Sequence, residues 1–241
     1  MYDRPPLSRC LEWREAEVQG FIQETPRARS VALHVAGWPG HAAGQHVDIR
    51  LTGQERTAER SYSIASATGD ASLTLLVARY ADGAVSRYLT SDVRVGDKLQ
   101  LRGPKGECFT PQPDGPIFVI AAGSGIVPLM ALLRHREMTA SSSRAVLLYS
   151  SRTADEIIYR AELERMTARS DLRVFHVLTR VRPTCWGGGV RRIDRATMAE
   201  FGPLASARPQ VFICGPPPFV ETMNHFLVDL GHDRRLIRTQ R

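Results

Sequence analysis

This chain of 241 residues has very little lysine and few aromatic side chains. Lys98 and Lys105 are its two lysines, yet the formal net charge is +7, so arginine carries nearly all of the positive charge. Aromatic residues make up 7% of the chain, and no nucleic-acid recognition motif is present, which argues against a nucleic-acid-binding protein. An arginine-rich composition is also typical of G+C-rich genomes, so the charge alone identifies no partner.

The chain also lacks paired cysteines. Cys10, Cys108, Cys185 and Cys214 are scattered, without a C-x-x-C pair. A zinc ribbon or a protein-bound iron–sulfur cluster needs suitably spaced thiolates, so we expect no metal site. No disulfide framework is indicated either, which favours a reducing compartment, and we expect a cytoplasmic protein.

Uninterrupted apolar segments of membrane-spanning length are missing as well. The longest apolar stretch, residues 116–133, contains Gly123, Gly125 and Pro128 near its centre. It therefore indicates a strand, a turn and a helix rather than a membrane span. The first 14 residues are charged and contain proline, unlike a secretory signal. We expect no membrane insertion.

What is present in the first half is the pattern of a small antiparallel barrel. Short apolar segments recur between turn residues at a spacing typical of such barrels. These segments are residues 31–35, 46–51, 61–65, 72–79 and 98–101. The turns between them include residues 37–40, 68–70, 81–83 and 94–97.

The pattern changes at the proline-rich residues 111–116, which indicate a joint between two domains, residues 1–112 and 113–241. After the joint, apolar strands are predicted over residues 117–121, 145–149, 174–178 and 211–214. Helices are predicted over residues 128–137, 155–168, 195–201 and 219–230. Apolar strands separated by helices imply a parallel sheet that is covered on both faces.

The most informative local motif is Arg60-Ser61-Tyr62-Ser63. On a strand, Arg60 and Tyr62 share one face while Ser61 and Ser63 share the other. A flavin dinucleotide needs a cation for its pyrophosphate, an aromatic ring against the isoalloxazine and a polar group near N5, and these residue types supply them. Taken alone, the segment is better explained as an ordinary strand with alternating polar residues.

Two glycine turns suit phosphate groups. Residues 83–86 combine a glycine with the start of a short helix, where free backbone N–H groups and the helix dipole attract an anion. Residues 123–128 follow a strand and open a helix, the context that a dinucleotide loop requires. Pro128 replaces the third glycine of the usual fingerprint, and proline suits a first helical turn. A hairpin turn and a plain strand–helix turn are the alternatives.

Five motifs together resemble the ferredoxin–NADP reductase family, in its stand-alone bacterial form without a fused ferredoxin domain. In chain order they are Arg60-x-Tyr62-Ser63, Gly83-x-Val85-Ser86, Gly103-Pro104-x-Gly106, Gly123-x-Gly125-x-x-Pro128 and Cys214-Gly215-Pro216. They span nearly the whole chain. The resemblance implies an N-terminal six-stranded antiparallel β-barrel that binds FAD, and a C-terminal α/β domain with a five-stranded parallel sheet that binds NADP, with NAD possible.

The resemblance also implies residue roles. Arg60 would contact the FAD pyrophosphate, Tyr62 would stack on the flavin, and Ser63 would hydrogen-bond N5. The other implied flavin-binding residues are Ser61, Val77, Ala78, Arg79, Ala84, Val85 and Ser86. The implied nucleotide-binding residues are Gly123, Ser124, Gly125, Pro128, Gly215 and Pro216. Cys214 would lie beside the nicotinamide C4 and would, with Ser63, be catalytic, although a buried thiol at a strand end is the alternative.

The choice of coenzyme depends on the adenosine 2′ position. A 2′-phosphate requires arginines and hydroxyls, whereas a free 2′-hydroxyl requires a carboxylate. After the second and third strands of the expected parallel sheet, the chain offers Ser151, Arg152, Thr179, Arg180 and then Arg191. We therefore predict NADPH. NADH stays possible, because Asp155 and Glu156 begin the next expected helix and the arginines could be solvated surface.

One departure from the family concerns the C-terminus. In many relatives an aromatic side chain there covers the nicotinamide-facing side of the flavin, but this chain ends in Thr239-Gln240-Arg241. Either the natural end has been trimmed or that flavin face is open. An open face would let nicotinamide stack more readily and would loosen coenzyme selectivity.

These observations predict an FAD-dependent oxidoreductase that passes electrons from NADPH to a separate one-electron acceptor, namely a ferredoxin, flavodoxin, haem or molybdenum-cofactor partner. The positive charge favours an acidic acceptor protein. The alternatives are an NADH-dependent reductase component of an oxygenase and a non-catalytic flavin-binding electron-transfer subunit. We expect a monomer.

Overall fold

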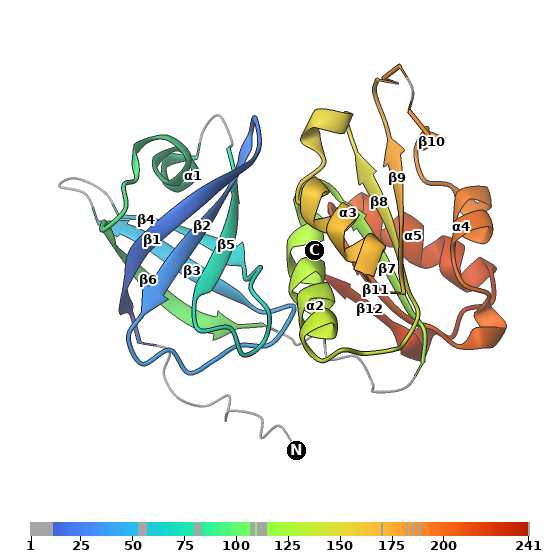
Figure 1. Ribbon diagram of the computed structural model, residues 1–241, viewed down its shortest axis with the longest axis horizontal. Helices are drawn as coiled ribbons and strands as arrows, with labels where there is room; N and C mark the ends of the chain where they lie inside the picture. The colour runs from blue at the N-terminus through green and yellow to red at the C-terminus, as the bar shows by residue number, and fades with distance from the viewer. Residues whose placement is uncertain are drawn as a thin grey trace.

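The computed structural model describes residues 12–52, 57–79, 83–106, 109, 115–169, 171–181, 183–184, 186–187 and 189–240. The chain forms two lobes, an antiparallel barrel from the first half and a layered α/β domain from the second (Figure 1). The expected domain boundary at residues 112 and 113 lies outside the described residues, as do Cys10, Cys108 and Cys185.

The barrel consists of six strands with the order β4-β3-β6-β1-β2-β5, and all neighbours are antiparallel. They are β1 (Arg14–Thr25), β2 (Ala28–Val35), β3 (His46–Thr52), β4 (Thr57–Ser63), β5 (Leu73–Ala78) and β6 (Lys98–Lys105). A backbone bridge between Ile64 and Leu75 joins the two outer strands and closes the barrel. The predicted six-stranded barrel is confirmed.

Strand β1 has no clear signal in the sequence. Its buried residues Ala16 and Val18 alternate with polar ones, and the alternation then ends at a register shift between Val18 and Gly20. A β-bulge of this kind inserts a residue and sends the following side chains to the other face. The periodicity that would have predicted the strand is therefore interrupted.

One end of the barrel is closed by α1 (Ala84–Arg87), which continues into a π-helical turn, η1 (Tyr88–Asp92). Val85 and Leu89 of this segment are buried in the same apolar core as Val47, Ile49 and Leu101 of the strands. The short helix packs against β3 and β4. Burial of these side chains thus brings the turn at Gly83 next to the strand that carries residues 60–63.

The second lobe contains a parallel sheet with the strand order β10-β9-β8-β7-β11-β12. Its strands are β7 (Ile117–Ala122), β8 (Ala145–Ser151), β9 (Leu172–Leu178), β10 (Gly189–Val190), β11 (Gln210–Cys214) and β12 (Ile237–Gln240). The predicted α/β fold is confirmed, but the sheet has six strands where five were expected. The two outermost strands, β10 and β12, are short and lack an apolar run.

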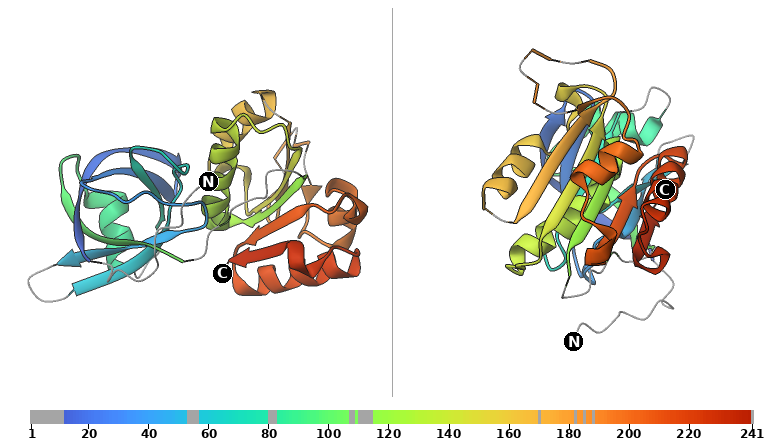
Figure 2. Two further views of the ribbon diagram at one scale, coloured as in Figure 1. Left: turned by 90° about the horizontal axis from the view of Figure 1, so that it is seen from below. Right: turned by 90° about the vertical axis from the view of Figure 1, so that its right-hand side faces the viewer.

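Helices cover both faces of this sheet (Figures 1 and 2). α2 (Ile126–Met138) and α3 (Arg160–Arg169) cover one face, and α4 (Arg195–Phe201) and α5 (Pro217–Asp229) cover the other. Short 3-10 turns lie at η2 (Gly123–Gly125), η3 (Ala154–Glu156), η4 (Ala205–Ala207) and η5 (Arg234–Leu236). Across the described ranges, no helix combines the length and apolar character needed to cross a membrane.

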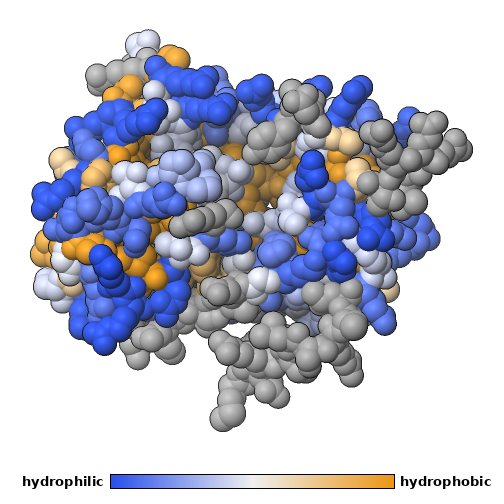
Figure 3. Space-filling model, turned by 180° about the vertical axis from the view of Figure 1, so that it is seen from behind, coloured by the Kyte–Doolittle hydropathy of each residue, from blue (hydrophilic) through white to orange (hydrophobic). Residues whose placement is uncertain are grey.

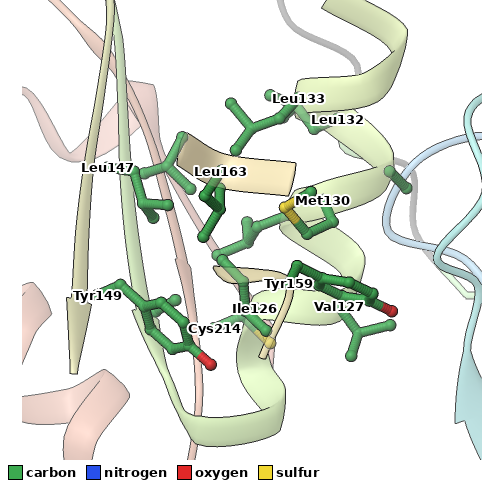
Figure 4. Close-up of a cluster of buried hydrophobic side chains, with 14 of the residues drawn as sticks. Ile126, Val127, Met130, Leu132, Leu133, Leu147, Tyr149, Tyr159, Leu163 and Cys214 are labelled. Carbon is green, nitrogen blue, oxygen red and sulfur yellow. The ribbon is translucent and has the colours of Figure 1, made fainter. Parts of the chain in front are cut away.

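The single helix predicted over residues 155–168 is wrong in extent. The 3-10 turn η3 ends at Glu156, and α3 begins only at Arg160. Between them, Tyr159 has a φ angle of +59°, a left-handed conformation that a continuous α-helix cannot contain. The break points Tyr159, which is almost fully buried, toward α2 (Figure 4).

The two lobes share one apolar core. Ala43, Ala65 and Leu76 of the barrel belong to the same buried cluster as the side chains of α2. The rings of Phe109 and Phe212 lie 5.4 Å apart across the junction. Because a continuous core is hard to shear, α2 is held close to the barrel.

Candidate functional site

A cavity of about 570 Å³ lies where the barrel meets the start of α2. A volume of this size is typical of cofactor and small-molecule sites. Four segments line it: Arg60, Ser61, Tyr62 and Ser63 of β4, Leu76 and Ala78 of β5, Gly83 and Ser86 at α1, and Ser124 and Val127 at α2. Seen from behind, apolar surface is visible in the hollow between the two lobes (Figure 3).

The four residues of the flavin motif all line the cavity, but they differ in surroundings. Arg60 is exposed, and its Nη1 donates to the carbonyl oxygen of Glu59 at 2.9 Å. Tyr62 packs against the barrel core, which orients its ring. The Ser61 hydroxyl donates to Asp48 Oδ1 at 2.7 Å, so the barrel already uses this group.

Asp48 was not found from the sequence, although it supports this strand. Burial alone would raise the pKa of its carboxyl group, but hydrogen bonds from Lys105, Ser61 and Arg102 outweigh burial and hold the pKa at about 2. Arg102 Nη2 lies 3.0 Å from Asp48 Oδ2. The carboxylate therefore ties β3 to both β4 and β6, which keeps the flavin motif in register.

We expect Asp48→Asn to be less stable than the natural protein by on the order of 2 kcal/mol at neutral pH. The folded pKa of about 2 lies below the usual 3.8, so the carboxylate stabilises the fold above pH 3.8. That contribution is lost as the pH falls through the folded pKa. Urea unfolding between pH 7 and about pH 2 measures it, and the variant should show a flatter dependence on pH.

Glu15→Gln is the matched control for Asp48→Asn. Glu15 pairs with Lys98 at 2.7 Å, but both side chains are more than 60% exposed. An exposed pair of this kind contributes at most about 1 kcal/mol. A pH dependence in Asp48→Asn equal to that of the natural protein would contradict the assignment.

The turn at Gly83, which was predicted to bind phosphate, opens a short helix beside the cavity. The first N–H groups of a helix have no partners within it, and those at the start of α1 lie beside the cavity. Ser86 lines the cavity and its hydroxyl donates to the Gly83 carbonyl at 3.0 Å. Ala84, one residue after Gly83, is exposed.

Two of the predicted flavin-binding side chains point elsewhere. Val77 and Val85 are both buried in the barrel core, with exposed fractions of 0% and 1%, and neither lines the cavity. Ala78 lines the cavity. Arg79 is exposed, and its backbone N–H donates to the carbonyl of Arg27 at 2.8 Å.

The second glycine turn lies at the point where the order of the parallel strands reverses. β7 has β8 on one side and β11 on the other, and η2 directly follows β7. In open parallel sheets, ligands bind outside the carboxyl ends of the strands at such a switch point. Gly123 has a φ angle of +55°, which favours glycine. Pro128 is buried in the first turn of α2.

Gly125 meets a different requirement, namely close packing. A Cβ atom on it would lie 2.4 Å from the Cys214 carbonyl oxygen and 2.7 Å from the Gly215 nitrogen. No side chain fits there, and the close approach joins the turn to the end of β11. Gly215 is itself confined, since a Cβ on it would lie 2.8 Å from the Phe219 ring. Pro216 then precedes α5.

Tyr149 is a further residue that the sequence did not indicate. It is fully buried in β8, and its hydroxyl donates to the Gly123 carbonyl at 3.0 Å. The Tyr149 hydroxyl oxygen also accepts a hydrogen bond from the backbone N–H of Ile158 at 3.4 Å. Burial raises the pKa of the phenol, so it stays protonated and can donate. Figure 4 shows Tyr149 and Cys214 near Ile126 at the start of α2.

Cys214 ends β11 and belongs to the buried cluster on the α2 side of the sheet. Its side chain is 6% exposed, and burial raises the pKa of the thiol to about 12. The group is therefore a neutral thiol at ordinary pH and a poor nucleophile. This protonation state suits a group that positions a ligand.

Four of the residues predicted around the adenosine 2′ position, Ser151, Arg152, Thr179 and Arg180, lie at the carboxyl ends of β8 and β9. The backbone N–H of Thr179 donates to Ser151 at 2.9 Å, and that of Arg180 donates to Arg152 at 3.0 Å. Ser151 is 4% exposed, and its side chain interacts with the buried Tyr149 phenol, so its hydroxyl is enclosed by the protein.

Arg191 is held somewhat apart from this group. Its Nε donates to the Thr197 hydroxyl at 3.2 Å, and its Nη2 lies 3.8 Å from a Glu200 carboxylate oxygen. Both partners belong to α4. Arg152, Thr179 and Arg180 are exposed at the carboxyl ends of β8 and β9. The two arginines are therefore more accessible to a ligand than Arg191, which is paired with α4.

A barrel with a flavin motif and a parallel sheet with a dinucleotide turn, joined at one cavity, define an FAD-dependent oxidoreductase that uses a pyridine nucleotide. Residues 32–109 match the oxidoreductase FAD-binding domain, and residues 119–225 match the oxidoreductase NAD-binding domain. NADH-cytochrome b5 reductase 1 of Aspergillus terreus is 31% identical over 238 residues, covering 91% of this chain and 80% of the relative. The chain belongs to the ferredoxin–NADP reductase-like family of flavin oxidoreductases.

Two solved structures show the same fold. The CS-b5R domains of human Ncb5or in the NAD⁺ form align with a TM-score of 0.84 at 24% identity, covering 98% of this chain and 71% of that one. A ferredoxin NADP⁺ reductase from Neisseria gonorrhoeae with bound FAD and NADP aligns with a TM-score of 0.78 at 22% identity, covering 95% and 98%. Both likenesses extend over both lobes.

Proposed function

We propose that this protein is an NADPH-dependent reductase that passes electrons, through bound FAD, to a separate one-electron acceptor protein. The observation that carries the proposal is the shared cavity. Residues 60–63 of the flavin motif and Ser124 of the dinucleotide turn line the same volume of about 570 Å³. A flavin on β4 and a nicotinamide at the turn would meet there, as a direct transfer between them requires.

The residues around the cavity fit FAD. Arg60 supplies a cation for a pyrophosphate, the start of α1 supplies backbone N–H donors, and Tyr62 supplies an aromatic face. When bound, FAD accepts two electrons from a reduced nicotinamide and releases them singly. The protein's own contribution is to orient the two cofactors and exclude water.

Ser63 and Cys214 are proposed to position the reacting rings. The Ser63 hydroxyl lines the cavity on the barrel side. The Cys214 thiol, with a pKa of about 12, adds no negative charge beside an approaching dinucleotide. Both groups would act by fixing geometry, which is a proximity effect.

The arginines at the sheet edge support NADPH as the coenzyme. The sequence contains no carboxylate between Asp171 and Asp194, whereas five arginines occur in that interval. NADH is the second candidate, because the curated relatives are named NADH-cytochrome b5 reductases and Asp155 and Glu156 lie in η3.

The acceptor is proposed to be an acidic one-electron carrier protein. The formal net charge of +7 would attract such a partner and speed its encounter. The attraction should weaken as salt is added, because the Debye length falls to about 8 Å at physiological ionic strength. Cytochrome b5, which the relatives' names contain, is one acceptor to test beside a ferredoxin and a flavodoxin.

Stopped-flow mixing of the natural protein with NADPH should bleach the yellow colour of the flavin.

The variants Arg152→Ala and Arg180→Ala should each weaken NADPH binding. Loss of one charge-assisted hydrogen bond to a phosphate raises the concentration needed for half-maximal rate by about 10- to 100-fold. With NADH, which lacks that phosphate, the same variants should change the concentration needed for half-maximal rate by less than about 3-fold.

Arg173→Ala is the matched control for the two arginine variants, since Arg173 is an exposed arginine near the opposite end of β9. Equal losses with both coenzymes in the Arg152 and Arg180 variants would contradict the NADPH assignment. Faster bleaching of the natural protein by NADH would favour the oxygenase-reductase alternative. A flavin that neither coenzyme bleaches would indicate a non-catalytic subunit.

A further inference from the structure

Helix α2 carries an arginine that connects the dinucleotide domain to the barrel. Arg134 lies in the second half of α2, and its Nη1 donates to the carbonyl oxygen of Ala65 at 2.6 Å. Ala65 is only two residues beyond Ser63, the last residue of the flavin-motif strand. This hydrogen bond thus joins α2, which follows the glycine turn at residues 123–125, to the segment directly after the strand that bears the flavin motif.

The guanidinium of Arg134 is held in one orientation. Its Nε and Nη2 donate to the two oxygens of Glu162 on α3, at 2.8 and 2.6 Å. The guanidinium carbon also lies 4.8 Å from the ring centre of Tyr159. The Arg134 side chain is 19% exposed and that of Glu162 is 24% exposed. A partly buried bidentate pair of this kind has a defined geometry, and its third donor is directed at Ala65.

The barrel side of the contact is equally fixed. Ala65 is fully buried, and its backbone N–H donates to Thr74 at 2.8 Å. Its neighbour Ile64 forms the bridge to Leu75 that closes the barrel. A buried carbonyl without a partner is costly, so the Ala65 carbonyl requires a donor, and Arg134 supplies it from the other domain.

A second contact lies beside the first. Ser30 donates to Glu24 at 2.6 Å in the hairpin of β1 and β2, and the Glu24 carboxylate also interacts with the backbone of Tyr159. Tyr159 is the residue whose left-handed conformation breaks the segment before α3. Figure 4 shows its ring beside Val127 and Met130 of α2. The interface is therefore built around the residues that surround Arg134.

We propose that Arg134 is a positioning residue for electron transfer between nicotinamide and flavin, because it sets the distance between β4 and the start of α2. The proposal rests on the proposed function. The reaction itself would be unchanged: a hydride, which is one proton with two electrons, would pass from nicotinamide C4 to flavin N5. Without the contact to Ala65, the shared apolar core would still hold α2 on the barrel, but the spacing between β4 and the start of α2 would be less sharply defined. A displacement of about 1 Å slows such a step by on the order of 100-fold.

A neighbouring ion pair provides a matched control. Arg165 of α3 donates to both oxygens of Glu137 on α2, at 2.8 and 3.2 Å. In the part of the chain that the structure describes, Arg165 pairs with carboxylates of α2 and α3 and with no barrel residue. Arg165→Met therefore removes a link between the two helices but leaves the link to the barrel.

The test compares FAD-loaded Arg134→Met, Arg134→Lys and Arg165→Met with the natural protein. In stopped flow, flavin reduction at saturating NADPH should slow by on the order of 100-fold in Arg134→Met. The apparent dissociation constant of the nucleotide should change by less than about 3-fold, because Arg134 does not line its site. Arg134→Lys keeps the charge beside Glu162 but lacks the planar donor fork, so an intermediate rate is expected.

A second readout does not depend on activity. Amide hydrogen exchange in the backbone segment 64–67 should be faster by about 10-fold in Arg134→Met, because the carbonyl of Ala65 loses its partner and the segment opens more often. Arg165→Met should exchange like the natural protein. If Arg134→Met does not fold, the same reduction and exchange measurements on the milder variant Arg134→Lys are compared with those on the natural protein.

Each outcome decides the proposal. Slow reduction with unchanged nucleotide affinity and faster exchange in the Arg134 variants alone supports it. An unchanged reduction rate in Arg134→Met, or an equal loss in Arg165→Met, overturns it. If neither NADPH nor NADH reduces the natural protein, the proposed function fails and the electron-transfer role with it, whereas the exchange experiment still reports whether Arg134 joins the two domains.

Discussion

Arg60→Ala is expected to purify with little or none of its yellow flavin colour. Arg60 is an exposed cation at the wall of the cavity, and its contact with the Glu59 carbonyl leaves further donors of the guanidinium for a ligand. Each charge-assisted hydrogen bond to a pyrophosphate contributes about 1.5–3 kcal/mol. Loss of two such bonds would weaken FAD binding by on the order of 100- to 10,000-fold.

A fluorescence titration of flavin-free Arg60→Ala with FAD measures this loss. Arg94→Ala is the matched control, because Arg94 is an exposed arginine in the turn before β6 and does not line the cavity. Unfolding temperatures of both flavin-free variants should be alike, since neither side chain is buried. A flavin dissociation constant of Arg60→Ala equal to that of the control would rule out a pyrophosphate contact.

Gly125→Ala is expected to lose most of its nucleotide-dependent activity and part of its stability. The added Cβ would lie 2.4 Å from the Cys214 carbonyl oxygen, so either η2 or the end of β11 must move. Overpacking of this kind costs about 1–3 kcal/mol. A shift of about 1 Å in the dinucleotide turn at η2 would slow flavin reduction by on the order of 100-fold. FAD binding should survive, because the flavin motif is on the barrel.

Gly123→Ala separates crowding from backbone strain. Apart from its two neighbours in the chain, no atom of the described residues lies within 4 Å of a Cβ built on Gly123, so the obstacle there is its φ angle of +55°. The left-handed conformation costs an alanine about 1–2 kcal/mol, without displacing any neighbour. Thermal unfolding and stopped-flow reduction of the two variants measure the difference. If Gly123→Ala reduces its flavin as slowly as Gly125→Ala, crowding against β11 is not the cause.

Local patterns made much of the candidate site predictable. The residues of the flavin motif are adjacent in sequence, so strand periodicity alone assigns them to one element. The turns at Gly83 and Gly123 each combine glycine with the start of a helix, and the structure contains α1 and α2 directly after them. The same reasoning missed β1, β10 and β12, where a bulge or a short edge strand removes the apolar periodicity.

The supporting residues could not be predicted, because their partners are distant in sequence. Ser61 and Asp48 are 13 positions apart, Tyr149 and Gly123 are 26 apart, and Arg134 and Ala65 are 69 apart. An isolated aspartate, tyrosine or arginine on a strand or helix gives no indication of which loop it will reach. Their partners are determined only when the strands pair and α2 packs on the barrel.

By itself, the sequence determined the class of protein, because the order of its motifs along the chain predicts a flavin domain followed by a dinucleotide domain. Tertiary structure alone decided that the flavin motif, residues 60–63, and Ser124 of the dinucleotide turn line one cavity. Parallel strands end at a common edge, which brings Gly125 against Cys214, and the shared core seats the start of α2 on the barrel beside Ser63. It also turned Val77 of β5 and Val85 of α1 into the barrel core, because the strand and the short helix that closes the barrel both bury apolar side chains there.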